Sequence, residues 1–409
     1  SKMPVRAMVL TWLKQPGFPV VEIEKQDSTL HLKQRRYMME SDKKSNGLWS
    51  IPLSIGLKDE SFQKLFTKKS MSVKLPKNNI GFVANFGRKG FYRVKYDEGT
   101  LLDLKMLVDQ KQIPAIDRWA IQNDLFSLCI SCDETVRNYL DFSDAYYDED
   151  SYLASVNVAH NLSSLYFRAF DEEFSSEIRN YAVNYLKKIL YDLGWNPKKT
   201  DKHTDAMMRG FAISTLGKLD DDEVIIESEN RYKQFLKNPN SLSPDLVEPV
   251  CSVMAWNGNS KTHEELTRLY RNAKTMEEKL RFLGAMCSFK DEKLLLKSLN
   301  FSQTSEVRSQ NMQLPIMKVA ANPYGKKILW PWLKTNWSKL NKKVGRGNPL
   351  FNRIVASISS IADDSMEKEI RQFFKKNPTP GTERTQEQTL ERIRISSKFL
   401  RSMRKEFTS

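Results

Sequence analysis

The sequence has too few histidines, at the wrong spacing, to build the commonest zinc site of hydrolases. Only four of its 409 residues are histidine: His31, His160, His203 and His263. No two are four residues apart, so the two-histidine helix face of a His-Glu-x-x-His motif cannot form. The segment that starts at His263 begins like this motif but ends in Thr267. We therefore predict no metal-binding residues in this chain.

Cysteine is equally scarce and forms no recognisable framework. Cys129 and Cys132 have the two-residue spacing of a redox or zinc motif, but they lie in a helical pattern without a second pair. Cys251 and Cys287 are isolated. Because buried free cysteine behaves as a small hydrophobic residue, we interpret all four as structural thiols. The lack of a dense disulfide framework favours a reducing compartment, and we expect a cytoplasmic protein.

Other catalytic motifs and long apolar segments are also missing. There is no Gly-x-Ser-x-Gly elbow, no Gly-x-x-x-x-Gly-Lys-[Ser/Thr] phosphate loop, and no Gly-x-Gly-x-x-Gly after a strand. No run of 18 apolar residues occurs and 28% of the residues are charged, which speaks against a membrane-spanning helix or a signal peptide. We predict that this chain alone is not an enzyme and has no cofactor and no membrane partner.

Acidic residues are outnumbered, because 65 Lys and Arg face 50 Asp and Glu and leave a net charge of +15. One stretch is basic without any acidic residue, and contains Lys326, Lys327, Lys334, Lys339, Lys342, Lys343, Arg346 and Arg353. Such a run is usually a solvated surface, but an anion-binding role remains open. Trp332 and Trp337 lie within it, where packing between helices is commoner than stacking on bases. We do not expect nucleic acid as a partner.

The first residues predict a helix that leads into the fold. Val5 to Lys14 has apolar residues at helical spacing, and the helix must end at Gln15-Pro16-Gly17-Phe18-Pro19. The start, Ser1-Lys2-Met3, runs straight into this segment and looks like a cut or a linker. We expect residues 1–17 to form a linker helix.

The next segment, residues 18–97, alternates apolar and polar residues with the period of β-strands. The clearest run is Trp49, Ile51, Leu53, Ile55 and Leu57. Pro52 falls on the outward set and cannot donate to a ladder, so this strand is predicted to lie at an edge or to carry a bulge. Short strands separated by polar turns predict a small β-sandwich.

Beyond Asp97 the alternation disappears, and residues 98–409 show one helical pattern after another. A stripe from Ile178 to Ile189 is closed by Gly194. Capping-box patterns occur at Thr275–Glu278 and at Thr385–Gln388. Many short helices cannot each bury a face alone, so we predict that they stack pairwise as a HEAT- or armadillo-like α-solenoid, although the sequence has no strict period.

Seven short motifs follow one another along the whole chain. They are Trp12-Leu-Lys-Gln-Pro-Gly-Phe-Pro-Val-Val21, Gly90-Phe-Tyr-Arg-Val-Lys-Tyr-Asp97, Arg118-Trp-Ala-Ile-Gln-Asn-Asp124-Leu-Phe126, Leu193-Gly-Trp195, Glu278-Lys-x-Arg281, Trp332-Leu-Lys-Thr-Asn-Trp337 and Gly381-Thr-Glu-Arg-Thr-Gln-Glu-Gln-Thr-Leu-Glu391. Each is weak alone, but chance does not explain their common order. Together they resemble the C-terminal part of the zinc aminopeptidases of the aminopeptidase N, puromycin-sensitive and tricorn-interacting-factor family.

This resemblance implies a function for the chain. In that family a preceding catalytic domain binds zinc through His-Glu-x-x-His and a later glutamate, and removes N-terminal residues from peptides. Neither this motif nor the amine-gripping Gly-x-Met-Glu-Asn segment occurs here. The chain is thus expected to be the substrate-enclosing or regulatory C-terminal region, with the catalytic domain and peptides as partners and zinc only in the parent enzyme. Arg384, Gln388 and Arg93 are the predicted peptide contacts, with capping and packing as the competing roles.

A different class of function remains open at this point. The helical region could be a free-standing scaffold that binds a protein or nucleic acid through the surface from Lys326 to Arg353. Salt-dependent binding of nucleic acid would favour this alternative. The β-sandwich speaks against it, because a scaffold does not need one.

Overall fold

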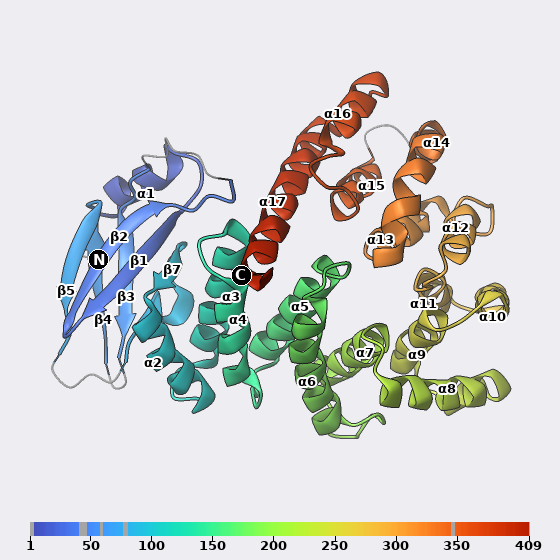
Figure 1. Cartoon of the computed structure of the whole chain (residues 1–409), viewed down its shortest axis with the longest axis horizontal. Coiled ribbons are helices and arrows are strands. Elements are labelled where there is room, and N and C mark those ends of the chain that lie inside the picture. Colours follow the sequence, from blue (N-terminus) through green and yellow to red (C-terminus); the bar gives the residue numbers. More distant parts are fainter. Residues whose placement is uncertain (1–3, 41–46, 58–59, 77–80, 345–347, 409) are drawn as a thin grey trace. The chain divides into compact units, whose positions relative to one another are not determined.

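The computed structural model describes residues 4–40, 47–57, 60–76, 81–344 and 348–408 (Figure 1). The predicted cut at Ser1–Met3 lies outside these residues. The chain divides into two compact units. Unit 1 comprises Ser1–Leu165 and Phe399–Ser409, and unit 2 comprises Tyr166–Lys398. Strands precede helices along the chain, which confirms the predicted fold class, a small β-sandwich followed by helices.

Unit 1 begins with helix α1 (Val5–Leu13), which ends before Gly17 as predicted. The described residues then form the strands β1 (Pro19–Gln26), β2 (Thr29–Arg36), β3 (Ile51–Gly56), β4 (Ser61–Phe66), β5 (Ser70–Lys74), β6 (Val83–Ala84) and β7 (Arg93–Tyr96). One sheet has the order β5-β2-β1-β7 and the other β4-β3-β6. Strand β1 is antiparallel to β2 and parallel to β7. The buried Gln34 of β2 ties this sheet to the segment before β3. Its side-chain nitrogen donates to the Trp49 carbonyl and its side-chain oxygen accepts from the Trp49 amide, both at 2.9 Å.

The alternating run before and within β3 faces the core, as its period predicts. Trp49, Ile51, Leu53 and Ile55 are completely buried. The predicted edge position of this strand is wrong, because β3 lies between β4 and β6. In the described part of the sheet, β6 pairs only with Ile55 and Gly56. The β6 side of the strand is therefore unpaired at Pro52, which removes the need for the amide proton that proline lacks.

The strands pass into helices at Asp97, which is the N-cap of α2 (Glu98–Asp109). Its carboxylate accepts hydrogen bonds from the amides of Thr100 and Lys25, both at 2.8 Å, so it joins the helix to β1. Unit 1 continues with α3 (Ala115–Ser131), α4 (Val136–Ser143) and most of α5 (Tyr152–Arg168). The end of α17 (Glu383–Thr408) completes it, where Glu406 accepts the Val136 amide at 3.0 Å and caps α4.

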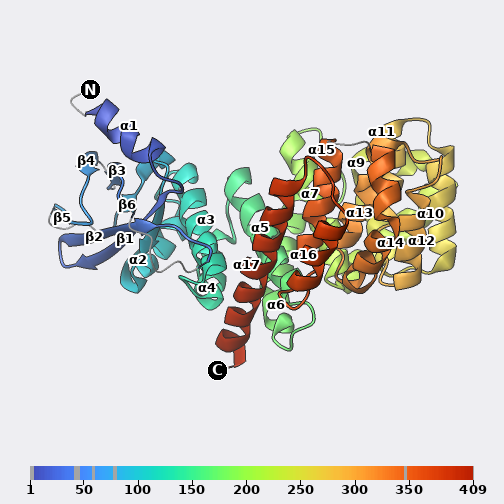
Figure 2. The same ribbon diagram turned by 90° about the horizontal axis from the view of Figure 1, so that it is seen from above.

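Unit 2 consists of helices that follow one another in chain order (Figures 1 and 2). They are α6 (Ser175–Leu193), α7 (His203–Lys218), α8 (Asp222–Lys237), α9 (Pro244–Trp256), α10 (Ser260–Asn272), α11 (Met276–Ala285), α12 (Glu292–Phe301), α13 (Gln313–Ala320), α14 (Lys326–Val344), α15 (Pro349–Ser357), α16 (Glu367–Lys376) and the larger part of α17. Helices α7, α9, α11, α13 and α15 contact one another in that order, and we call them the odd row. Helices α8, α10, α12 and α14 pack against this row, as in an α-solenoid.

A repeat that the sequence does not display appears in the hydrogen bonds of unit 2. His263 bonds the Ser298 hydroxyl at 3.0 Å, 35 residues away. The Tyr270 hydroxyl donates to the Glu306 carbonyl at 2.9 Å, 36 residues away. Trp332 donates to the Asn300 side chain at 2.8 Å, 32 residues away. Each bond joins one helix pair to the next at a separation of 32 to 36 residues, so a repeat of this length appears in the contacts although the sequence has no strict period.

The helix ends confirm one predicted capping box and correct the other. Thr275 and Glu278 exchange side-chain to backbone hydrogen bonds, both at 3.1 Å, at the start of α11. The box predicted at Thr385–Gln388 is wrong, because α17 already begins at Glu383. Gln386 instead reaches back to the Thr382 hydroxyl at 2.9 Å. The glycine before this turn, Gly381, has a φ of +89°, and the helix starts three residues earlier than a cap at Thr385 predicts.

Candidate functional site

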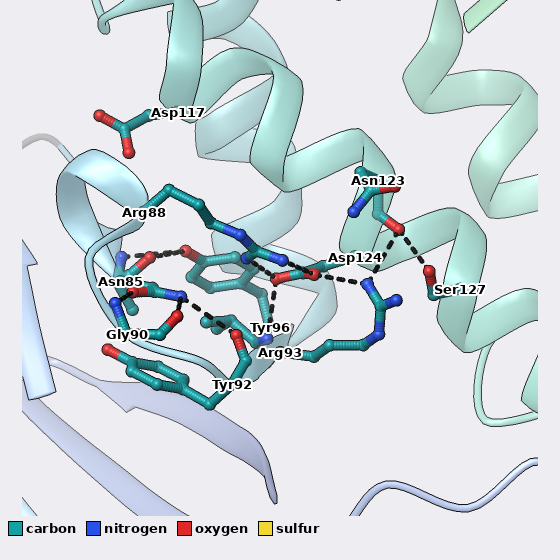
Figure 3. A network of polar contacts seen from close by, with 12 residues as sticks. Asn85, Arg88, Gly90, Tyr92, Arg93, Tyr96, Asp117, Asn123, Asp124 and Ser127 are labelled. Carbon is teal, nitrogen blue, oxygen red and sulfur yellow. Dashed lines mark hydrogen bonds and ion pairs between the residues drawn. The ribbon is translucent and has the colours of Figure 1, made fainter. Parts of the chain in front are cut away.

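Asp124 is the centre of a polar network in unit 1, where β7 meets α3 (Figure 3). Its carboxylate is buried and accepts two hydrogen bonds from the Arg88 guanidinium, at 2.6 and 2.7 Å. Arg93 Nη1 donates a third at 2.9 Å, and the Val94 amide a fourth at 3.0 Å. This single carboxylate therefore compensates two arginines and fixes the last strand of the sandwich to a helix.

The turn that carries Arg88 has an unusual backbone. Asn85 and Arg88 have φ values of +58° and +54°, in the left-handed region that non-glycine residues rarely adopt. The Asn85 side chain holds the turn by donating to the carbonyls of Gly90 and Tyr92, both at 3.0 Å, and by accepting the Gly90 amide at 2.8 Å. A Cβ on Gly90 would lie 2.2 Å from the Tyr92 ring, so this position admits only glycine.

Asp117 lies near this turn but is not part of the pair between Arg88 and Asp124 (Figure 3). One oxygen accepts the Gly87 amide at 2.7 Å. The other is buried and has no hydrogen-bond partner among the described residues. Burial raises the pKa of Asp117 above its ordinary value, while the Gly87 amide and the Arg88 charge oppose the shift.

Burial also controls the ionisation of the other groups around Asp124. It would lower the pKa of Arg88, but the hydrogen bond and charge of Asp124 raise that pKa above its ordinary value. Burial raises the pKa of Tyr92 to about 12 and that of Tyr96 further still. The Tyr96 hydroxyl accepts the Ala84 amide at 2.9 Å. All these groups keep their ordinary charge near neutral pH, so they form a structural junction rather than an acid and base pair.

Arg93, one of the predicted peptide contacts, belongs to this junction. Besides its bond to Asp124, its guanidinium lies 5.0 Å from the Tyr37 ring centroid and 5.8 Å from that of Phe18. The Tyr37 hydroxyl donates to the Ser127 carbonyl at 2.7 Å, so the sandwich is also tied to α3 from this side. These contacts are those of a packing residue, the competing role that the sequence left open.

The motif from Arg118 to Phe126 is explained by three separate contacts. Arg118 forms a two-pronged ion pair with Glu149, at 2.6 and 2.7 Å, in a buried position. Phe126 packs against Tyr139 with ring centroids 5.0 Å apart. Asp124 supplies the junction described above. Arg118, Asp124 and Phe126 are thus used for packing within unit 1.

The motif Leu193-Gly-Trp195 is a helix end whose carbonyls are bound by an arginine. Gly194 has a φ of +67° and terminates α6. The fully buried Arg209 donates to the Gly194 carbonyl at 2.8 Å and pairs with Asp201 at 2.5 Å. This buried charge therefore satisfies the last turn of α6 and fastens the loop to α7.

The other two predicted peptide contacts lie on α17 in unit 2. Arg384 and Gln388 are both exposed and stand one helical turn apart, so they share a face. They are on the solvent side of the first turns of the helix. The structure brings these two residues together, while Arg93 belongs to the other unit.

The basic stretch from Lys326 to Arg353 is partly neutralised. Lys326 pairs with Asp171 at 3.3 Å and Lys334 with Glu369 at 2.7 Å. Arg346 lies outside the described residues. Trp332 and Trp337 are 5% and 3% exposed, so their rings cannot stack on bases, and the prediction of packing between helices is confirmed.

No group of three or more His, Cys, Asp or Glu side chains in the described ranges is placed to hold a metal ion. Cys129, Cys251 and Cys287 are buried free thiols, and Cys132 is partly exposed. Burial raises the pKa of Cys287 to about 12. Among the described helices, none has the length and apolar character needed to span a bilayer.

His263 is a core residue, and its environment predicts a pH-dependent stability. The ring is 1% exposed, and burial lowers its pKa to about 4, with a smaller contribution from the Lys297 charge. Between pH 6.5 and 4 the His263 imidazole is therefore protonated in the unfolded chain and neutral in the folded chain. We expect unit 2 to lose on the order of 3 kcal/mol as pH falls through this window, with the full contribution present above pH 6.5.

Urea unfolding at a series of pH values, followed by amide hydrogen exchange in unit 2, measures this effect. A His263→Gln variant is expected to flatten the pH dependence, and His31→Gln, at an exposed position of unit 1, serves as the control. An equally steep loss of stability in His263→Gln would show that another group is responsible.

The sequence alone did not reveal which residues the charged side chains of these motifs bind. Arg88 and Glu149 are distant in sequence from the residues they bind, and no local pattern marks them. The acidic character of residues 141–150 was the only available signal for Glu149. Arg209 could have been suspected only as a charged residue on an otherwise apolar helix face.

Comparison with known proteins gives a consistent result. A family model described as ERAP1-like C-terminal domain matches residues 82–395. Aminopeptidase M1-D of Oryza sativa subsp. japonica is 29% identical over 425 residues, which cover 99% of this chain and 48% of that protein. Aminopeptidase M1 of Arabidopsis thaliana is 28% identical, with 99% and 49% covered. The Probable aminopeptidase 2 of Sulfurisphaera tokodaii is 25% identical, with 94% and 46% covered.

The chain thus spans about half the length of the relatives it matches. The match to the family model covers most of the sequence and begins in the β-sandwich, so the motifs that suggested the family are not isolated coincidences. The chain belongs to the ERAP1-like C-terminal domain family of the aminopeptidases.

Proposed function

We propose that this chain is the substrate-enclosing C-terminal region of a zinc-dependent aminopeptidase, which removes N-terminal amino acids from peptides. In this proposal the chain itself binds no zinc and hydrolyses no peptide. The zinc and the catalytic residues belong to a preceding catalytic domain. The observation that carries the proposal is the alignment of nearly the whole chain with aminopeptidases about twice its length.

The exposed face of α1 supports a partner at the start of the chain. Val5, Val9 and Leu10 are 40–49% exposed and Leu13 is 76% exposed, and none of the residues of α1 is buried. The Phe91 ring is 72% exposed nearby, where it contacts Trp12 with centroids 6.4 Å apart. An amphipathic helix with an uncovered apolar face is expected to pack against another surface. We propose that this surface is the catalytic domain.

The odd row of unit 2 supports the enclosing role. A row of stacked helices presents a continuous surface to which an extended peptide can bind. Arg384 and Gln388 are exposed and can reach a peptide carboxylate or backbone, and we propose them as contacts. Arg93 remains a predicted contact, although its described neighbours are Asp124, Tyr37 and Phe18.

We also propose a cytoplasmic location and three structural parts. The four free cysteines are compatible with a reducing compartment. The parts are a linker helix over residues 1–17, a β-sandwich over 18–97 and a helical domain over 98–409. The end of β7 at Tyr96 and the cap of α2 at Asp97 support the second boundary.

The proposal predicts that activity and zinc appear only with the catalytic part. We expect the 409-residue chain to bind no stoichiometric zinc by mass spectrometry and to release no fluorophore from aminoacyl coumarins. The gene upstream of Ser1 is expected to encode His-Glu-x-x-His and, about twenty residues later, a glutamate. The full-length product should bind one zinc per chain and cleave these substrates.

The same full-length enzyme tests the peptide contacts. Arg384→Ala and Gln388→Ala should raise KM for long peptides and leave KM for aminoacyl coumarins unchanged, with the exposed Lys327→Ala as the control. Stoichiometric zinc on the 409-residue chain, or an upstream gene without the zinc motif, would overturn the proposed function. If these variants have the same KM for long peptides as the unmodified enzyme, only the proposed peptide contacts at Arg384 and Gln388 are overturned.

A further inference from the structure

Helix α1 and the turn that follows it are tied to the segment before β3 by three polar contacts. Trp12 Nε1 donates to the Ser50 carbonyl at 3.1 Å, and the Thr11 hydroxyl accepts the Ser50 amide at 3.0 Å. Gln15 Nε2 donates to the Leu48 carbonyl at 2.8 Å. The position of α1 on the sandwich is therefore fixed, although no residue of the helix is buried. A helix that is held in place with its apolar side uncovered is a preformed surface for a partner.

Ring contacts connect α1 to an arginine of the sandwich. The Trp12 ring lies 6.4 Å from Phe91 and 6.3 Å from Trp49, measured between centroids. The Arg36 guanidinium lies over Trp49, 5.9 Å from its centroid. Phe91 is 72% exposed, and Leu48, next to Trp49 in the chain, is 45% exposed. We call Trp12, Arg36, Leu48 and Phe91 the α1 surface.

Arg36 is the last residue of β2 and continues the set of side chains that faces the core. Leu30, Leu32 and Gln34 of this set are buried. Because side chains two residues apart share a face of a strand, Arg36 leaves the sandwich at the end of its core. Gly17 closes over its stem, since an added Cβ at Gly17 would lie 3.4 Å from Arg36 Cδ. The guanidinium is thus held at a defined place beside the Trp49 ring.

The charge of Arg36 is not paired within the described part of this chain. No carboxylate of these residues lies within ion-pair distance of its guanidinium, and its Nε atom is buried without an acceptor. The indole nitrogen of Trp49, which is completely buried, also has no acceptor there. The neighbouring Arg35 is different, because it pairs with Glu22 at 2.6 Å and with Asp133 at 3.0 Å. Buried donors in folded proteins are nearly always bonded, so the environment of Arg36 lacks an acceptor.

We propose that Arg36 binds a carboxylate of the preceding catalytic domain, and that an apolar patch around this carboxylate covers Leu48 and Phe91. This contact presupposes the proposed function, in which that domain lies outside this chain. A carboxylate is the acceptor whose planar pair of oxygens matches a guanidinium. The surrounding rings exclude water when the two surfaces meet, and the loss of water strengthens the charge-assisted hydrogen bonds.

The composition of the α1 surface favours a protein partner over a nucleic acid. Phosphate groups also bind arginine, but the exposed side chains beside Arg36 are apolar and form no contacts that a phosphate backbone requires. Arginine beside tryptophan and phenylalanine is instead the composition of the centre of a protein interface. An unpaired guanidinium in such a dry contact is costly, so a partner with a neutral or basic side chain at this place is disfavoured.

Carbodiimide cross-linking of the full-length enzyme tests this contact directly. Arg36→Lys keeps the positive charge and supplies an amine, which carbodiimide joins to a touching carboxylate as an amide, while the displaced oxygen leaves on the reagent as a urea. Peptide mass spectrometry should find position 36 joined to an Asp or Glu upstream of Ser1. The exposed Lys33 of the same strand is the control and should form no such cross-link. If position 36 is joined only to residues of this chain, or stays unlinked while other lysines react, the proposed contact is wrong.

Hydrogen exchange separates a contact between domains from packing within unit 1. In the full-length enzyme, Arg36→Gln should speed the exchange of the α1 amides by about tenfold, the size expected when a charge-assisted hydrogen bond is lost. In the 409-residue chain the same substitution should change exchange less than about twofold, because the carboxylate is absent. Lys33→Gln should leave both forms unchanged. Equal effects in the two forms, or none in the full-length enzyme, would contradict the contact.

Failure of this contact is distinguishable from failure of the proposed function. An upstream gene without His-Glu-x-x-His overturns the proposed function and, with it, the contact. A full-length enzyme that binds zinc and cleaves aminoacyl coumarins, but shows neither the cross-link nor the difference in exchange, overturns only the contact at Arg36.

Discussion

Replacement of Asp124 by alanine is expected to lower the free energy of unfolding of unit 1 by about 3–5 kcal/mol, because two arginines and a backbone amide lose their common acceptor. The cost comes mainly from the uncompensated charges. Arg88 and Arg93 have side chains only 20% and 19% exposed, so water cannot fully replace the carboxylate. Asp124→Asn keeps the shape and should retain part of the stability, because an amide oxygen still accepts hydrogen bonds.

Urea unfolding compared with hydrogen exchange measures this loss and locates it. Exchange should increase in β7 and α3, while the helices of the odd row stay protected. Asp109→Asn, at an exposed position of α2, is the matched control and should change little. A loss below about 1 kcal/mol in Asp124→Ala would mean that the arginines are adequately solvated without the carboxylate.

Replacement of Trp256 by alanine is expected to destabilise unit 2 by about 3–5 kcal/mol, the usual cost of deleting a buried tryptophan. Its ring is 2% exposed, and its indole nitrogen donates to Asp220 at 3.1 Å. Lys290 joins the same carboxylate at 2.6 Å and lies 5.4 Å from the ring centroid, while the Tyr324 ring is 5.5 Å away. The side chain thus connects the turns that follow α7, α9, α11 and α13.

The part of the protein that loses stability distinguishes Trp256→Ala from Asp124→Ala. Hydrogen exchange should increase around the turns after α7 and α11, whereas β7 should be unaffected. Trp256→Phe keeps a ring in the core and is expected to lose less than half as much, mainly the hydrogen bond of about 1 kcal/mol and some buried area. Tyr191→Ala, at a side chain 85% exposed, is the control. Equal losses in Trp256→Ala and Tyr191→Ala would contradict the prediction.

Much of the secondary structure follows from patterns that are local in sequence. The alternation from Trp49 to Ile55 predicts strands, and the stripe from Ile178 to Ile189 predicts α6 with its end at Gly194. The box at Thr275 predicts the start of α11. These predictions succeed because the interactions that stabilise turns, caps and amphipathic faces join residues within about four positions of one another.

The errors arise where a neighbouring strand or an adjacent turn decides the outcome. Pro52 was expected at an edge or at a bulge, but the short β6 pairs only with Ile55 and Gly56 and makes a central strand possible. Thr385 fits a cap, yet the turn around Thr382 starts the helix earlier. A one-dimensional pattern contains the preference of each residue, but not the length of the strand or turn that comes to lie beside it.

The candidate site shows the same division. The sequence identified Asp124 and Arg118 as members of a motif, and Arg93 as a charged residue at the junction. Only the structure shows that Asp124 binds both Arg88 and Arg93, and that Arg118 binds Glu149.

The sequence by itself determined the order of strands and helices, the family and the absence of a His-Glu-x-x-His motif, since all three depend on residue types at short spacing. The tertiary structure alone decided which charges are paired and which helices share a row. The ion pairs of Asp124 with Arg88 and of Arg118 with Glu149 join residues more than 30 positions apart and depend on how the backbone folds back on itself. The period of unit 2 belongs to this second group, because it resides in contacts between successive helix pairs and not in repeated letters.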